Sequence, residues 1–322
     1  MRIRFWGTRG SIPVALTPAD IRDKLAQALV AASGRRFQSF GEAHAFAQDA
    51  LPLSVTHTFG GHTSCVELQT ARDEYFVCDM GTGARAFGEH VLARQGGRPA
   101  IINVFMSHVH WDHIMGFPFF GPAYVRGTRI RIHGCHPVLE HAFRLQQAPP
   151  CFPVAFNQLS ASIEFVKLTP GETREVSGVN VTPKLQRHSG ESYGFRFEAE
   201  GHSVVYSTDS EHKLEDPAET AAFVRFFRGA DLVIFDAMYS LAEAVSVKED
   251  WGHSSNIIGV ELCQMAEAKH LMLFHHEPAN DDATIEGILK DARRLEELTR
   301  NAQPRPRALK ISAAYDGLEI DL

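Results

Sequence analysis

Short runs of apolar residues that stop abruptly at polar ones recur along the chain. The run over 101–108 (IINVFMSH) and the run over 270–276 (HLMLFHH) both end in histidine. Such runs are typical of strands buried on both faces of a sheet, with functional side chains at their C-terminal ends. From these runs, or from alternating apolar and polar positions, we predict strands over 2–6, 65–70, 74–80, 101–108, 129–135, 162–168, 179–185, 193–200, 203–209, 231–239 and 270–276.

Apolar positions at helical spacing lie between many of these strands. They predict helices over 83–95, 137–147, 216–228, 254–268 and 282–300. The last of these starts at Asp281-Asp282, where negative charge suits the helix dipole. The final segment, 309–322, is expected to form a strand hairpin around Asp316-Gly317. Strands and helices therefore interleave, which predicts a layered α/β domain with mixed sheets.

An Ala-rich stretch with helical spacing interrupts the strands early in the chain. It covers residues 18–50 and contains the segments DIRDKLAQALVAA and FGEAHAFAQDAL. A helical insertion at about 17–56 is therefore expected after the first strand. Two roles stay open for it: it covers the active site, or it forms a contact in a homodimer. No linker rich in Gly or Ser divides the chain, so residues 1–322 are expected to form one elaborated domain.

Charge and cysteine content narrow the setting. The chain carries 32 Lys and Arg against 39 Asp and Glu, a net charge of −7, which argues against broad binding to phosphate backbones. Its five cysteines are scattered and form no CxxC pair, so a reducing compartment is expected. The N-terminus has no apolar signal region, and no run of about 18 apolar residues occurs, so a cytoplasmic protein without a membrane segment is expected.

Histidine is unusually frequent, with 17 residues in the chain. The segment Ser107–His113, at the end of a predicted strand, contains three of these histidines and one aspartate. Residues at i and i+2 of an extended chain point to the same side, so His108 and His110 can converge on one metal. Asp112 and His113 are adjacent and face different directions, so they can serve a second metal nearby. Zn²⁺ accepts such nitrogen and oxygen ligands. This concentration of ligand types predicts a metal site.

Other predicted strands end in the remaining ligand types, namely His188, Asp209 and His275. A carboxylate such as Asp209 can bridge two cations and lower their mutual repulsion. Two metals about 3.5–4 Å apart can then activate a bridging hydroxide and stabilise a phosphoryl or acyl oxygen.

In their order along the chain, these motifs resemble those of the metallo-β-lactamase-fold hydrolases. The segment CDMGTG over 78–83 matches the first motif of that family, and HVHWDH over 108–113 matches the second. The resemblance implies a four-layer αββα sandwich of two mixed β-sheets flanked by helices, classed as α/β or, by some schemes, α+β. It also implies two divalent metals at one edge, zinc by preference, with manganese or iron as alternatives. The implied ligands are His108, His110 and His188 at one metal, Asp112, His113 and His275 at the other, and Asp209 between them, with Asp79 orienting the loop by hydrogen bonds.

Two features resemble the branch of this family that contains ribonuclease Z and related phosphodiesterases. Position 209 is Asp rather than the Cys of zinc β-lactamases. The segment Trp251–Ser255 (WGHSS) resembles the additional histidine motif of that branch, in which the histidine donates a proton to the leaving alkoxide or supports the phosphate in the transition state. The resemblance therefore implies His253 and Asp112 as catalytic residues.

Further residues near these motifs are candidates for substrate contacts. Arg9 can reach an anionic substrate, with a turn-stabilising role as the alternative, and Ser189 can touch a phosphate. Trp111 and the segment Phe117–Phe120 can form an apolar wall beside the metals, although core packing is the ordinary role of such residues.

The implied activity is that of a di-metal hydrolase, and the leading hypothesis is a phosphodiesterase that acts on cyclic nucleotides or other small phosphodiesters. Hydrolysis of a carboxyl ester, lactone or thioester at the same site is the first alternative. A ribonuclease Z-like endoribonuclease is the second, disfavoured because residues 113–188 contain no basic, Gly-rich arm and the net charge is −7. A metal-retaining binding or signalling module is the alternative outside enzymes. The expected partner is therefore a small phosphodiester rather than long RNA.

Overall fold

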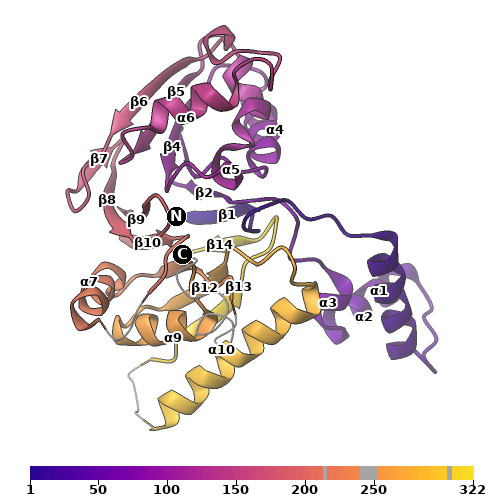
Figure 1. Cartoon of the computed structure of the whole chain (residues 1–322). Coiled ribbons are helices and arrows are strands. Elements are labelled where there is room, and N and C mark those ends of the chain that lie inside the picture. The colour runs from indigo at the N-terminus through magenta and orange to yellow at the C-terminus, as the bar shows by residue number, and fades with distance from the viewer. Residues whose placement is uncertain (213–215, 240–251, 303–306) are drawn as a thin grey trace.

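Two β-sheets pack face to face at the centre of the protein (Figure 1). The structure, a computed structural model, describes residues 1–212, 216–239, 252–302 and 307–322. The first sheet has the strand order β14-β1-β2-β3-β4-β5-β6, and the second has β13-β12-β11-β10-β9-β8-β7. The first sheet consists of β1 (Arg2–Gly7), β2 (Cys65–Gln69), β3 (Tyr75–Cys78), β4 (Ile101–Met106), β5 (Arg129–Gly134), β6 (Ser162–Lys167) and β14 (Glu319–Asp321). The second consists of β7 (Arg174–Val176), β8 (Val179–Gln186), β9 (Ser192–Ala199), β10 (His202–Ser207), β11 (Leu232–Asp236), β12 (His270–Phe274) and β13 (Lys310–Ala313).

Helices cover the outer face of each sheet, which gives four layers in the order helix, sheet, sheet, helix (Figure 1). On the side of the first sheet lie α4 (Ala84–Gln95), α5 (Trp111–Ile114), α6 (Leu139–Gln146) and the 3-10 turns η1 (Phe117–Phe119), η2 (Gly121–Tyr124) and η3 (Phe156–Gln158). On the side of the second lie α7 (Pro217–Phe227), α9 (Asn256–Met265) and α10 (Asp282–Ala302). Within the described residues, no helix combines the length and the apolar character needed to cross a membrane. The arrangement confirms the predicted four-layer α/β sandwich.

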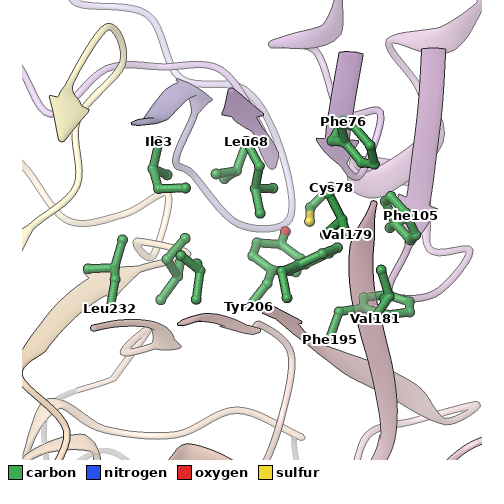
Figure 2. Close-up of a cluster of buried hydrophobic side chains, with 14 of the residues drawn as sticks. Ile3, Leu68, Phe76, Cys78, Phe105, Val179, Val181, Phe195, Tyr206 and Leu232 are labelled. Atoms are coloured by element: carbon green, nitrogen blue, oxygen red, sulfur yellow. The ribbon is translucent and has the colours of Figure 1, made fainter. Parts of the chain in front are cut away.

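The two sheets are joined by an apolar core that lies between them (Figure 2). Ile3 and Phe76 of the first sheet lie across this core from Tyr206 of the second. Successive side chains of a strand point to opposite faces, so in β11 Ile234 lies in this core while Phe235 packs beneath the helices. Both faces of the central strands are therefore buried, which explains why their sequences are continuous apolar runs.

The strands that precede the candidate site residues share a direction within each sheet. β3 is parallel to β4 in the first sheet, and β10, β11 and β12 are parallel to one another in the second. Asp79 follows β3, Ser107–His113 follows β4, and Asp209 and His275 follow β10 and β12. The C-terminal ends from both sheets meet at one edge of the sandwich, since donor atoms from both lie within 4.8 Å of one another there.

One sequence prediction about the C-terminal segment is wrong. Residues 309–322 form no hairpin, because β13 pairs with β12 in the second sheet whereas β14 pairs with β1 in the first. The turn expected at Asp316-Gly317 is present and is closed by a backbone hydrogen bond. The Asp316 carboxylate also accepts hydrogen bonds from the backbone of Gly61 and His62, each at 2.9 Å. These bonds hold the chain where it crosses from one sheet to the other, a long-range effect that a local turn signal does not contain.

The segment expected as a helical insertion at about 17–56 holds α1 (Pro18–Ala31), α2 (Phe40–Ala50) and α3 (Leu53–Thr56). We call residues 17–56 the arm. Figure 1 shows the arm to one side of the sandwich, with α3 beside the start of α10. None of the three helices contains a buried residue. The arm therefore adds little to the core and must be attached by other contacts.

Lys24 ties α1 to the rest of the protein. Its ammonium donates hydrogen bonds to the carbonyl oxygens of Ser54 and His57 and to the carboxylate of Asp282, the last at 2.7 Å. Asp282 is buried at the start of α10 and also accepts a hydrogen bond from Phe59 N at 2.9 Å. Because α1 buries no apolar residue, these charge-assisted bonds are its main visible attachment.

Lys24→Ala is expected to loosen α1 without unfolding the sandwich. Hydrogen bonds to charged groups contribute about 1.5–3 kcal/mol, so amide hydrogen exchange in α1 should rise roughly tenfold to a hundredfold. Exchange in the central strands should stay unchanged. Hydrogen-exchange mass spectrometry measures both, with Arg22→Ala as the matched control because Arg22 is exposed on the same helix. Unaltered exchange of α1 in Lys24→Ala would show that other contacts hold the arm.

Candidate metal centre

Three histidines from two strand ends form the first cluster of the site. His108 and His110 follow β4, and His188 follows β8. One ring nitrogen of each lies within 4.8 Å of the other two, and His188 Nε2 is 3.1 Å from His110 Nδ1. His108 Nε2 is buried and has no hydrogen-bond partner in the described part of the chain. Three converging nitrogens, one of them without a hydrogen bond, suit a metal ion.

Four buried residues form the second cluster, namely Asp112, His113, Asp209 and His275. One donor atom of each lies within 4.8 Å of all the others. Asp112 Oδ2 is 3.2 Å from His113 Nε2 and 3.4 Å from His275 Nε2. The two imidazole nitrogens are themselves 3.3 Å apart. This cluster therefore offers two imidazoles and two carboxylates to a common point.

Asp209 lies between the two clusters. Its Oδ1 is 3.2 Å from Nε2 of both His113 and His275. Its Oδ2 is 3.6 Å from His108 Nε2 and 3.7 Å from His188 Nε2. The backbone at Asp209 has a φ of 48°, in the left-handed region that aspartate enters more readily than most residues. The two oxygens of one carboxylate thus face two sets of imidazoles, which is the arrangement of a ligand that bridges two cations.

The charges around His113 fit a bound cation. Burial alone would lower the pKa of His113, yet the carboxylates of Asp209, Asp112 and Asp79 raise it well above its ordinary value. Burial likewise disfavours the ionised form of Asp209, but the imidazoles of His113 and His275 hold the pKa of its carboxyl well below the ordinary value. Buried carboxylates around these rings require positive charge, which a divalent cation supplies. Imidazole and carboxylate together are a donor set that Zn²⁺ accepts.

The Asp79 carboxylate fixes the loop after β4 through hydrogen bonds. Its carboxylate accepts hydrogen bonds from His113 Nδ1 at 2.7 Å, from Ser107 N at 2.8 Å and from the Tyr206 hydroxyl at 2.8 Å. The bond to Nδ1 leaves Nε2 of His113 facing the second cluster. Such bonds fix the orientation of a ligand ring and the nitrogen that carries its proton.

Two glycines let the backbone approach the histidine rings. A Cβ on Gly10 would lie 2.5 Å from the His275 ring, and a Cβ on Gly252 would lie 2.4 Å from His188 Nδ1. Gly252 also has a φ of 83°, and its carbonyl oxygen accepts a hydrogen bond from His188 Nδ1 at 2.8 Å. The loop after β1 and the segment before α9 therefore both close against the site, and side chains are excluded where they do so.

His253 lies beside both clusters and is paired with Asp236. Its Nδ1 is 2.8 Å from Asp236 Oδ2, and its ring centroid is 5.1 Å from that of His188 and from that of His275. Burial would lower the pKa of His253, but the Asp236 carboxylate raises it to about 9. Asp236 was missed by the sequence reasoning. It ends the apolar strand β11, the same signal that singled out Asp209.

The two proposed substrate contacts lie in different environments. The Arg9 guanidinium is buried and donates hydrogen bonds to the carbonyl oxygens of Gly60, Glu277 and Asn280. These bonds favour the turn-stabilising role that the sequence left open. Ser189 is exposed and directly follows His188, a residue of the first cluster, in the chain.

The expected apolar wall divides into two parts. Phe117 and Phe120 are fully buried in the core beneath the first sheet. Trp111 and Phe119 are exposed instead. Trp251, the first residue of the additional histidine motif, lies outside the described residues.

Comparison with known proteins agrees with this fold. Residues 75–276 match the model of the beta-lactamase superfamily domain. The chain is 22% identical over 283 residues to a ribonuclease Z of Anoxybacillus flavithermus, which covers 73% of this chain and 88% of that protein. The structure of the metallo-beta-lactamase fold protein YhfI from Bacillus subtilis has a TM-score of 0.65 at 17% identity, over 99% of this chain and 98% of that one. Human tRNase Z, short form, has a TM-score of 0.59 at 18% identity, over 100% and 99%. The structural likenesses show the shared fold.

Asp209→Ala is expected to lower metal content more than loss of any other single residue of the clusters, because among the described cluster residues Asp209 alone has one side-chain oxygen towards each cluster. We expect the purified protein to hold about two equivalents of metal, Asp209→Ala less than one, and His188→Ala about one. Inductively coupled plasma mass spectrometry after dialysis measures these contents. His141→Ala, at an exposed histidine on α6, is the control. Equal metal content in Asp209→Ala and in the unaltered protein would contradict the bridging arrangement.

Proposed function

The chain belongs to the beta-lactamase superfamily, among metal-dependent hydrolases related to ribonuclease Z, and on that premise we propose that it hydrolyses small phosphodiesters, cyclic nucleotides above all. The observation that carries the proposal is the pair of His253 and Asp236 beside a centre whose two clusters share Asp209. A centre for two cations suits the negatively charged oxygens of a phosphodiester, and a proton donor is then needed at the leaving oxygen.

We assign the ligands by cluster, with zinc as the favoured metal. When bound, two divalent cations supply Lewis acidity and lower the pKa of water at the site. The chain's own part is to hold the donor atoms in place and to keep the carboxylates ionised. Asp112 contributes through its Oδ2, which also accepts a hydrogen bond from Ser11 N at 2.8 Å. The assigned ligands are His108, His110 and His188 at one cation, Asp112, His113 and His275 at the other, and Asp209 at both.

We assign His253 as the residue that protonates the leaving oxygen. Its Nδ1 donates a hydrogen bond to the buried Asp236 carboxylate, which fixes the ring and leaves Nε2 as the second nitrogen able to donate. One of its ring nitrogens lies within 4.8 Å of donor atoms of both His188 and Asp209. A substrate phosphate held by the two clusters would therefore lie within reach of this imidazole.

RNA is the second candidate substrate, because relatives of this chain include a ribonuclease Z. The net charge of −7 disfavours it, since binding to a long phosphate backbone depends on a basic surface. A small phosphodiester needs only the charge of the metal centre itself. We therefore give the small substrate precedence and use RNA as a test substrate.

The metal-loaded protein is expected to hydrolyse bis(p-nitrophenyl) phosphate and at least one cyclic nucleotide, with activity lost on chelation and restored by zinc. Release of p-nitrophenolate and chromatography of the nucleotide product measure this. Cleavage confined to precursor transfer RNA would move the substrate class to RNA. Silence on all phosphodiesters together with turnover of lactones or thioesters would overturn the proposal.

His253→Ala is expected to slow the reaction most where the leaving group is poor. p-Nitrophenolate departs without a proton, whereas the alkoxide of a cyclic nucleotide needs one. Loss of a general acid should therefore lower kcat on the cyclic nucleotide by about a hundredfold or more, and on the p-nitrophenyl ester by less than about tenfold. Asp236→Asn should show the same trend more weakly. The controls are an unchanged metal content in both variants and unchanged activity in the His141→Ala variant. Equal losses on both substrates would assign His253 to phosphate binding instead.

A further inference from the structure

One large aromatic side chain is exposed directly beside the clusters in the chain. Trp111 is 71% exposed, although it lies between His110 and Asp112, which belong to the two clusters. Large aromatic side chains gain from leaving water, so an exposed tryptophan at this position is informative in a way that a scattered exposed residue is not.

The backbone explains why position 111 faces outward but not why it is tryptophan. α5 is a single turn, and its other residues, Asp112, His113 and Ile114, are buried. Trp111 occupies the remaining side of that turn and therefore faces solvent. A polar residue would satisfy this geometry at no hydrophobic cost. The sequence instead places the largest apolar ring of the amino acids between two of the ligand-cluster residues, His110 and Asp112.

The loop after β1 closes against the same turn. The backbone N–H of Ser11 donates a hydrogen bond to Asp112 Oδ2 at 2.8 Å, which holds the residue that follows Trp111. His110, which precedes Trp111, belongs to the first cluster and is exposed. The exposed indole is therefore flanked in the chain by one residue of each cluster.

We propose that Trp111 binds the base of a nucleotide substrate, and that the protein therefore discriminates nucleoside phosphodiesters from simple alkyl ones. This inference rests on the proposed function, because a phosphate at the metal centre is what brings its substituent to the indole. Trp111 lies in the chain between His110 of the first cluster and Asp112 of the second, so the exposed indole adjoins residues of both groups that would hold the phosphate. Aromatic faces that are open to solvent stack on planar bases of any sequence. A flexible alkyl chain is instead held best by an enclosed apolar channel.

The test compares two substrates that share a leaving group, the p-nitrophenyl ester of thymidine 5′-monophosphate and methyl p-nitrophenyl phosphate. The measured quantity is the preference, defined as the ratio of their kcat/KM values. Trp111→Ala should lower the preference about tenfold, because loss of one stacked base contact has an effect of this order, and Trp111→Phe should restore part of it. Metal content must match the unaltered protein in both variants. Leu298→Ala, at an exposed apolar residue of α10, is the control and should keep the full preference.

An unchanged preference in Trp111→Ala, with metal content intact, would overturn the inference. So would a dimer of the unaltered protein that Trp111→Ala dissociates in sedimentation, because a second copy would then cover the indole. If the unaltered protein cleaves neither ester, the proposed function fails and the inference is read by binding alone. Quenching of tryptophan fluorescence by thymidine 5′-monophosphate that is lost in Trp111→Phe would then support it, and absence of quenching would overturn it.

Discussion

The site depends on one buried carboxylate that serves two groups of imidazoles. Asp209 is buried at the end of β10, where the Thr208 hydroxyl donates a hydrogen bond to Oδ1 at 2.6 Å and rings from both clusters surround the two oxygens. An ionised group at such depth is tolerated only where donors or positive charge offset its lost hydration. The histidine clusters satisfy that requirement, and Asp209 in turn fixes the separation between them. Neither cluster can move without disturbing the other.

This arrangement also explains why the core and the site form one structure. Tyr206 packs in the apolar layer between the sheets (Figure 2). Its hydroxyl donates a hydrogen bond to Asp79, which in turn orients His113. The contact runs from β10 in the second sheet to the end of β3 in the first. The packing of the two sheets therefore helps to set the position of the His113 imidazole. That position does not depend on the loop after β4 alone.

Local sequence signals found the strand ends and the ligand types, and the family that these motifs resemble supplied the four-layer fold. Asp236 ends an apolar strand as Asp209 does, but its pairing with His253 was missed, because His253 belongs to a separate segment and only the fold brings the two together. Local signals also misassigned 309–322, because an Asp-Gly turn says nothing about which strand each flank will pair with. The left-handed backbone at Asp79, Asp209 and His275 was equally invisible. These three features arise from tertiary contacts, whereas the alternation of buried and exposed positions is local and could be read directly.

The attachment of the arm has a consequence for how this family of chains can diversify. β1 and β2 remain antiparallel neighbours, with Gly7 opposite Cys65, although residues 8–64 lie between them. Closing a loop becomes harder only logarithmically with its length, by about 0.6 kcal/mol for each doubling. The near part of that loop is held independently, since Gly10 packs on His275 and Ser11 binds Asp112. The helical module beyond Thr17 can therefore change in length or be exchanged at little cost to the pairing of β1 with β2 or to the edge that holds the two clusters.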